Sequence, residues 1–154
     1  MKITKRTATL DDAATLLAWR NHPSTRKISR QPEQIHIDEH MEWLTARLNK
    51  SELEPFYLFF EDFQPVGMSR LDAMSGLIQK YEISILVDPN KQGKGIGTKI
   101  LSLTCESFLD LHPDHTIVAY INRSNYISQK LFVNAGFQLL PPFGDLLHFE
   151  KSSN

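Results

Sequence analysis

The sequence predicts one domain of mixed α/β (α+β) class, spanning residues 1–154, with about seven strands and four helices. Three observations support this prediction. Short runs rich in β-branched and aromatic residues recur along the chain, and longer segments carry apolar residues at helical spacing. A glycine-rich loop joins one strand directly to one helix. At 154 residues the chain also has the length of a single domain.

The composition excludes several classes of protein. Hydrophobic residues make up 41% of the chain, charged residues 23%, and the net charge is -1, values typical of an ordinary globular protein. This balance gives no electrostatic reason to expect nucleic acid or a membrane surface as the main partner. The first residues lack the apolar core of a secretory signal, and no run approaches the roughly 18 apolar residues of a membrane span. We therefore expect a cytoplasmic location.

The first third of the chain reads as strand, helix, irregular segment and helix. Residues 2–7 suit a short strand, and Thr9 with Asp12 resembles a capping box that opens a helix. Two prolines interrupt residues 21–34, so we expect an irregular segment there. The two helices are marked by apolar residues one turn apart: Leu10, Ala13, Ala14 and Leu17 in the first, and Ile37, Met41, Leu44 and Leu48 in the second.

The remaining elements follow from strand patterns and from turn residues. Residues 81–87, YEISILV, are the best candidate for a central strand, because their apolar residues are mostly β-branched or large. Gly136 is a suitable left-handed cap for the last helix. The other expected elements are strands at residues 56–61, 66–73, 115–121, 137–140 and 146–150, and helices at residues 97–111 and 125–135.

The glycine-rich loop lies in SILVDPNKQGKGIGTKIL, residues 84–101. Glycines allow close approach to a ligand, and the free N–H groups at a helix start carry partial positive charge, so such a loop suits a pyrophosphate. The spacing fits neither a P-loop nor a dinucleotide fingerprint. Gln92, Gly95 and Gly97 instead resemble the acetyl-CoA pyrophosphate loop of the GNAT superfamily. A plain turn from strand to helix is the alternative.

A second segment strengthens the resemblance to GNAT acetyltransferases. Residues 125–137, NYISQKLFVNAGF, are similar to a later segment of that family, and both segments stand in the family's order. The resemblance implies a mostly antiparallel sheet whose fourth and fifth strands splay apart around the pantetheine arm of acetyl-CoA. It implies backbone contacts to the arm from Leu86 and Val87. The implied pyrophosphate contacts are Gln92, Gly93, Lys94, Gly95, Ile96, Gly97 and Thr98, and Asn125, Ser128 and Phe132 would border the cofactor.

The family reaction is attack of an uncharged amine on the thioester, and the residues suggest candidates for the catalytic groups. A primary amine with a pKa near about 10.4 is mostly protonated at neutral pH, so a base is useful. Glu82 resembles the family's glutamate base in position, although it could simply pair with Lys80. Many relatives have a tyrosine acid where this chain has Phe132. Tyr126 is our candidate acid, with Tyr120 and Tyr81 as further possibilities, and each could equally be a packing aromatic.

The acceptor site is expected near the end of the first helix. Trp19, Arg20, Asn21, Arg26 and Arg30 resemble the corresponding region of UDP-amino-sugar N-acetyltransferases of pseudaminic acid biosynthesis. We therefore expect a UDP-amino sugar as the acceptor. An N-terminal or ribosomal-protein acetyltransferase and a non-catalytic acetyl-CoA-binding module remain alternatives. In a purely structural interpretation, Arg20 and Asn21 brace the helix end while Trp19 packs between helices.

Two further residue types carry no expected chemistry. His36 and His40 lie one helical turn apart without the glutamate of a zinc protease motif, so we expect a solvated helix face and no metal site. Cys105 is the one cysteine, which rules out an internal disulfide framework. Its place in an apolar helical stripe predicts a packing role.

Overall fold

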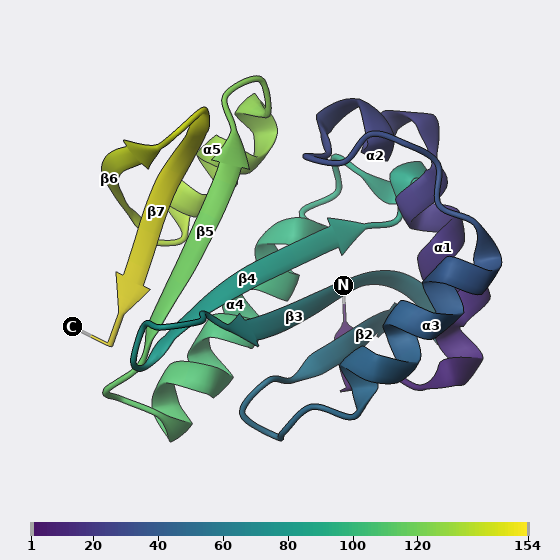
Figure 1. The fold of residues 1–154 in the computed structure, drawn as a ribbon, viewed down its shortest axis with the longest axis horizontal. Coiled ribbons are helices and arrows are strands. Elements are labelled where there is room, and N and C mark those ends of the chain that lie inside the picture. Colours follow the sequence, from purple (N-terminus) through teal and green to yellow (C-terminus); the bar gives the residue numbers. More distant parts are fainter. Residues whose placement is uncertain (1, 154) are drawn as a thin grey trace.

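The computed structural model describes residues 2–153, which form a seven-stranded sheet in the order β1-β2-β3-β4-β5-β7-β6 (Figure 1). Neighbouring strands are antiparallel except for the parallel pair β4 and β5. β4 lies in the middle, which confirms the prediction for YEISILV. The strands are β1 (Ile3–Thr7), β2 (Phe56–Glu61), β3 (Gln64–Ala73), β4 (Lys80–Val87), β5 (Thr116–Asn122), β6 (Gln138–Phe143) and β7 (Leu146–Ser152).

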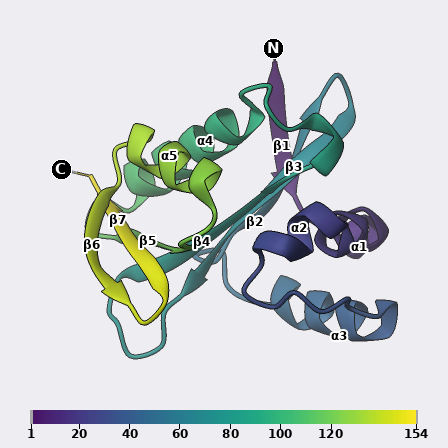
Figure 2. The same cartoon turned by 90° about the horizontal axis from the view of Figure 1, so that it is seen from above.

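Helices cover both faces of the sheet (Figure 2). The helices α1 (Ala13–Asn21), α2 (Pro23–Ile28) and α3 (Ile37–Leu48) lie on one face, while α4 (Ile96–Leu111) and α5 (Tyr126–Asn134) lie on the other. Each face has an apolar core: Leu44 packs in the one beneath α1 and α3, and Leu101 in the one beneath α4. Among the helices of residues 2–153, none has the length and apolar character needed to cross a bilayer.

The start of the first helical segment confirms the predicted capping box. The Asp11 amide donates to Thr9 Oγ1 over 3.2 Å, and the Thr9 amide donates to Asp12 Oδ2 over 2.9 Å. Arg6 adds two hydrogen bonds of 2.8 Å to the same Asp12 carboxylate. Two otherwise unpaired N–H groups are thereby satisfied, and a 3₁₀ turn at Leu10–Asp12 leads into α1.

Within residues 2–153 the structure has five α-helices, one more than the four expected. The additional helix is α2, inside the segment expected to be irregular. Pro23 occupies its first turn, where no intrahelical N–H is needed, and His22 caps it by accepting from the Ser24 amide over 3.2 Å. Proline disrupts the interior of a helix, but in the first turn it can begin a short one.

The predicted divergence of β4 and β5 is confirmed. The two strands pair only where Lys80, Tyr81 and Glu82 face residues 116–118. Beyond this point β3 holds β4 as far as Val87, and β7 holds β5 as far as Asn122. The facing edges at residues 83–87 and 119–122 therefore have no strand between them, and Figure 1 shows the two arrows moving apart.

Candidate active site

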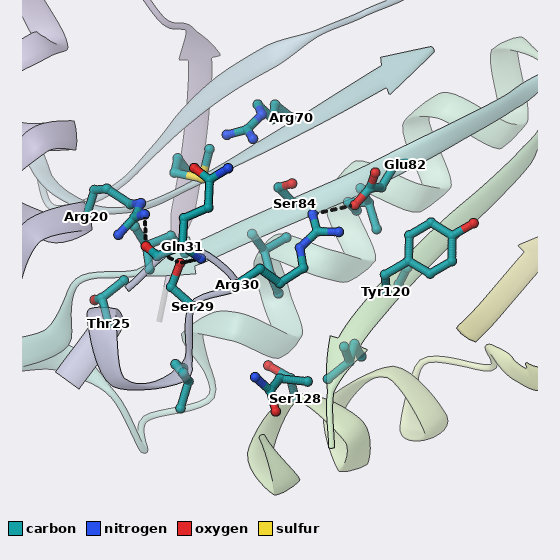
Figure 3. A pocket seen from close by; sticks show the side chains of 18 of the residues that line it. Arg20, Thr25, Ser29, Arg30, Gln31, Arg70, Glu82, Ser84, Tyr120 and Ser128 are labelled. Atoms are coloured by element: carbon teal, nitrogen blue, oxygen red, sulfur yellow. Dashed lines mark hydrogen bonds and ion pairs between the residues drawn. The ribbon is translucent and has the colours of Figure 1, made fainter. Parts of the chain in front are cut away.

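A cavity of about 670 Å³ opens where β4 and β5 diverge. Residues 83–86 of β4 and 119–122 of β5 form two of its walls, and Asn125, Ser128 and Phe132 contribute from α5 and its cap. Helices α1, α2 and α3 and the loop of residues 29–35 close the opposite side (Figure 3). The cavity thus connects the unpaired strand edges with the helices expected to hold an acceptor.

Glu82 lies in this cavity at the last residue where β4 pairs with β5. Its carboxylate accepts a hydrogen bond of 2.9 Å from Nη2 of Arg30, which reaches across the cavity from the loop after α2 (Figure 3). The expected alternative, an ion pair with Lys80, is not formed, because Lys80 donates to Glu150 over 2.9 Å. A charged group from the predicted acceptor region therefore contacts the candidate base.

The candidate tyrosines differ in their position relative to the cavity. Tyr126 begins α5, is 75% exposed and is not part of the cavity lining, whereas Tyr120 on β5 lies in the cavity near Glu82 (Figure 3). Tyr81 points to the opposite face and packs against Phe108. Burial raises the pKa of Tyr120, and the nearby carboxylates raise it further. The sequence contained a signal for the position of Tyr120. Side chains alternate along a strand, so residues 116, 118 and 120 of β5 share one face of the sheet.

The glycine loop has the backbone geometry expected of a ligand-binding turn. Gly93 and Gly95 have φ of 80° and 78°, a left-handed conformation that glycine adopts without strain. Gly95 is the N-cap of α4 and offers no side chain to bond the first amides of the helix. Those amides are therefore free to bind an anion.

The predicted cofactor residues separate into two groups. Leu86, Asn125, Ser128 and Phe132 line the cavity. Val87 and residues 92–98 lie outside its lining; Val87 is the last residue of β4, and residues 92–98 follow that end of the strand. Asn125 also caps α5, because its Oδ1 accepts from the Ser128 amide over 3.2 Å.

Of the five predicted acceptor residues, only Arg20 and Arg30 line the cavity. Trp19 is 6% exposed and packs in the core beneath α1 and α3. The Asn21 side chain donates through Nδ2 to the Ile35 carbonyl over 2.7 Å, and its Oδ1 accepts from the Ile35 backbone amide over 2.8 Å. Arg26 donates to the carbonyl of Pro32 over 2.8 Å. Trp19, Asn21 and Arg26 therefore lie outside the cavity lining, in contacts with the core and with the following loop.

Several residues that line the cavity were not among the site residues expected from the sequence. Arg70 on β3 lies over the Trp43 ring at 5.0 Å and donates to Asp72 over 3.0 Å. Ser84 lies two residues after Glu82 on the same side of β4, an alternation that was visible in the sequence. The position of Arg70 depends on the register of β3 with β4, for which no local pattern gives a signal.

His40 is a further correction, because it is buried rather than solvated. It is 5% exposed, lines the cavity, and has no hydrogen-bond partner at Nε2. Burial lowers the pKa of His40, although a hydrogen bond with the Ala13 backbone acts in the opposite direction. Within residues 2–153 no cluster of three His, Cys, Asp or Glu side chains is arranged to hold a metal. Cys105 is 2% exposed in the core, as its packing role predicted.

Sequence comparison identifies the class of protein that this fold and site define. Residues 2–138 match the family model described as "Acetyltransferase (GNAT) domain", so the chain belongs to the GNAT acetyltransferase family. Acetyl-CoA is the co-substrate of this class. No curated protein matches the sequence.

Several solved structures share the fold. One is yncA from Salmonella typhimurium, solved with its cofactor acetyl-CoA, with 24% identity over 99% of this chain and 94% of that one, and a TM-score of 0.79. A second is the ribosomal-protein-alanine N-acetyltransferase from Brucella melitensis, with 24% identity over 97% and 99% of the two chains and a TM-score of 0.80. A third is AAC(6')-Ib in complex with ribostamycin and coenzyme A, with 18% identity over 99% and 94%, and a TM-score of 0.85.

Proposed function

We propose that this protein transfers the acetyl group of acetyl-CoA to a primary amine on a nucleotide-linked amino sugar. The observation that carries the proposal is the cavity between β4 and β5, which places Glu82 between an unpaired strand edge and a wall rich in arginine. One side of this cavity suits the cofactor and the other suits an anionic acceptor.

The cofactor side has two parts. The backbone of Leu86 and Val87, on the free edge of β4, would bond the amides of the pantetheine arm as a further strand does. Residues 92–98 would hold the pyrophosphate on the free amides of α4. Asn125, Ser128 and Phe132 would border the arm from α5. Two separate elements would therefore hold two neighbouring parts of acetyl-CoA, its pantetheine arm and its pyrophosphate.

The chemistry needs a proton acceptor and benefits from a proton donor. Glu82 would take a proton from the acceptor's ammonium group, directly or through water, and the free amine would attack the thioester carbonyl. The carbon–sulfur bond would then break and coenzyme A would leave as a thiolate, which would take up the second proton that the nitrogen loses as the amide forms. Tyr120 lies in the cavity and could take the role of the missing family acid, although burial raises its pKa and makes it a weaker proton donor than an exposed tyrosine. A thiolate with a pKa near about 8.5 needs little such assistance.

The acceptor side favours a phosphorylated molecule. Arg20, Arg30 and Arg70 all line the cavity, and guanidinium groups bind phosphate through paired hydrogen bonds. Trp43, also in the lining, offers an aromatic face on which a nucleotide base could stack. A polycationic acceptor would meet repulsion from the same arginines.

An acetylation panel tests the proposal. Release of coenzyme A thiol would be followed with UDP-linked 4-amino sugars, with peptides bearing free N-termini and with an aminoglycoside. We expect turnover with the UDP-amino sugars. Turnover with the peptides and with no other amine would indicate an N-terminal acetyltransferase instead. Acetyl-CoA binding without turnover of any amine would indicate a non-catalytic binding module.

A further inference from the structure

The side chain of Arg70 is held in the cavity wall by two contacts. Its Nε donates to Oδ2 of Asp72 over 3.0 Å, and its guanidinium group lies over the ring of Trp43, 5.0 Å from the ring centroid. The side chain is 28% exposed and belongs to the lining of the cavity (Figure 3). A charged group that is already held in place loses little further freedom when it binds a ligand.

Asp72 is itself held in place, by the buried side chain of Arg47. Nε of Arg47 donates to Oδ1 of Asp72 over 2.6 Å, and Arg47 is 4% exposed. The same guanidinium group donates to the backbone carbonyls of Glu54 and Leu71, each over 2.9 Å. The Asp72 carboxylate is therefore a fixed support for Arg70.

The ion pairs around Asp72 leave an excess of positive charge. Three cations, on Arg47, Lys50 and Arg70, pair with Asp72, and Lys50 also pairs with Glu54. Three positive charges thus face two carboxylates. Arg70 is the cation of this cluster that lines the cavity, so the excess charge is available to an anionic ligand there.

The terminal nitrogens of Arg70 are free to bind such a ligand. Within residues 2–153 the Arg70 side chain makes one hydrogen bond, through Nε, and neither Nη1 nor Nη2 is among the buried atoms without a partner. Both nitrogens are therefore accessible to solvent. The other two cavity arginines differ, because Arg30 is neutralised by Glu82 and Arg20 donates to the Gln31 carbonyl while its Nη1 is buried.

We propose that Arg70 binds a phosphate group of the acceptor and so makes the enzyme selective for phosphorylated amines. Arg70 lies opposite Ser84, two residues after Glu82 on β4, so the three side chains share one face of the sheet. The acceptor binds with its phosphate at Arg70 and its amine at Glu82. Burial lowers the pKa of Arg20, and the charge of Arg70 contributes to the lowering, so an anion at Arg70 also relieves this repulsion. The inference rests on the proposed function and names the residue that recognises the acceptor by its phosphate.

Binding of two small probes tests the proposal without any need for acetyl transfer. Glucosamine 1-phosphate and glucosamine would be titrated by calorimetry in the presence of saturating coenzyme A, which keeps the pyrophosphate loop occupied. The two probes share the sugar and the amine and differ in the phosphate. We expect glucosamine 1-phosphate to bind at least about tenfold more tightly, because charge-assisted hydrogen bonds to phosphate are strong.

Arg70→Met is the decisive variant, with Lys5→Met as its matched control. Lys5 also lies over an aromatic ring, with Nζ 4.0 Å from the centroid of Tyr57, but it is outside the cavity lining. Each variant loses one positive charge, so a general electrostatic effect would appear in both. We expect only Arg70→Met to weaken binding of glucosamine 1-phosphate, by about tenfold to 100-fold, with unchanged affinity for coenzyme A.

Arg70→Lys tests the contribution of the planar guanidinium group. Lysine keeps the positive charge but presents a single ammonium group in place of two parallel N–H donors. We expect it to recover only part of the affinity that Arg70→Met loses. In both variants Asp72 keeps Arg47 and Lys50 as cationic partners, so the protein should remain folded, which thermal melting checks.

Three results would overturn the role of Arg70. They are equal binding, or no binding, of the two probes by the wild-type protein, a folded Arg70→Met variant that keeps the preference for glucosamine 1-phosphate, and a loss of coenzyme A affinity in that variant. Turnover of UDP-amino sugars together with one of these results would leave the proposed function standing without this phosphate site. Binding of the phosphate through Arg70 without acetylation of any sugar would refute the proposed function alone.

Discussion

Arg30 donates a hydrogen bond of 2.9 Å to Glu82, two residues that are 52 positions apart in the chain. The contact joins the loop after α2 to the point where β4 leaves β5. It gives the candidate base a cationic partner. An acceptor amine must therefore replace the guanidinium group or share the carboxylate with it.

Replacing Arg30 with alanine should change acceptor kinetics rather than folding. The Arg30 side chain is 50% exposed, and an exposed ion pair contributes about 0–1 kcal/mol at most. We expect a changed acceptor KM, an unchanged affinity for acetyl-CoA and a Tm within about 3 °C of wild type. In Arg26→Ala, loss of the bond to Pro32 should cost about 1 kcal/mol and leave the acceptor KM unchanged. Steady-state kinetics with thermal melting distinguish the two variants.

Replacing Glu82 with glutamine should remove the base. We expect kcat to fall about 100-fold near neutral pH and to recover partly at higher pH, where more of the amine is already neutral. Glu42→Gln, on the exposed surface of α3, is the control and should behave as wild type. A variant whose pH profile matches that of the wild type would show that water or another group takes the proton.

Replacing Gly95 with valine should weaken acetyl-CoA binding while the protein stays folded. A β-branched residue is strained at φ of 78° and brings bulk to the proposed pyrophosphate site. Gly76→Val is the matched control, because Gly76 has φ of 75° in the turn between β3 and β4. Both variants should lose similar stability. We expect only Gly95→Val to lose affinity for acetyl-CoA, by about tenfold or more, as measured by calorimetry.

The thiol of Cys105 should react only when the protein unfolds. Burial raises the pKa of Cys105 to about 12, and the reactive species is the thiolate. With a disulfide reagent we expect no rapid reaction in buffer and one thiol per chain in denaturant, since the sequence holds a single cysteine. Rapid labelling of the native protein would contradict the burial of this residue.

His40 should make the protein less stable in acid. Its folded-state pKa is lowered below the ordinary value of 6.5, so the unfolded chain binds the proton more readily. The associated stability is fully present above 6.5 and is lost as the pH falls toward the folded-state pKa. Between about pH 7.5 and about pH 5.5, the free energy of unfolding should fall more for wild type than for His40→Gln. Urea titrations at both pH values measure the free energy of unfolding. An equal decrease for wild type and for His40→Gln would contradict the prediction.

Elements with strong local signals were predicted well. The strand at residues 56–61 matches β2, and the capping box at Thr9 and Asp12 forms as expected. The glycine loop leads into α4 within one residue of the predicted start. Caps, glycines and periodicity act over a few residues, so a single sequence displays them. The segment holding α2 was missed because proline reads as a helix breaker unless it lies in the first turn.

The contents of the cavity could be predicted only in part. Glu82, Arg20 and Arg30 were expected there and lie there, whereas Tyr126 does not. Arg70 reaches the cavity because of strand register, and His40 because of the packing of α3. Both depend on contacts between segments distant in the chain, which local patterns do not encode.

The end of α1 separates what the sequence predicts from what tertiary structure determines, as its last residues Trp19, Arg20 and Asn21 illustrate. The sequence alone placed all three at the end of a helix, because helical spacing and the following proline mark that end. It could not say which way each side chain faces. Successive helical residues turn by about 100°, so Trp19 enters the core, Arg20 lines the cavity and Asn21 binds the backbone of the next loop. The rotation of α1 that makes this choice is set by its packing against α3 and the sheet, which exists only in the folded chain.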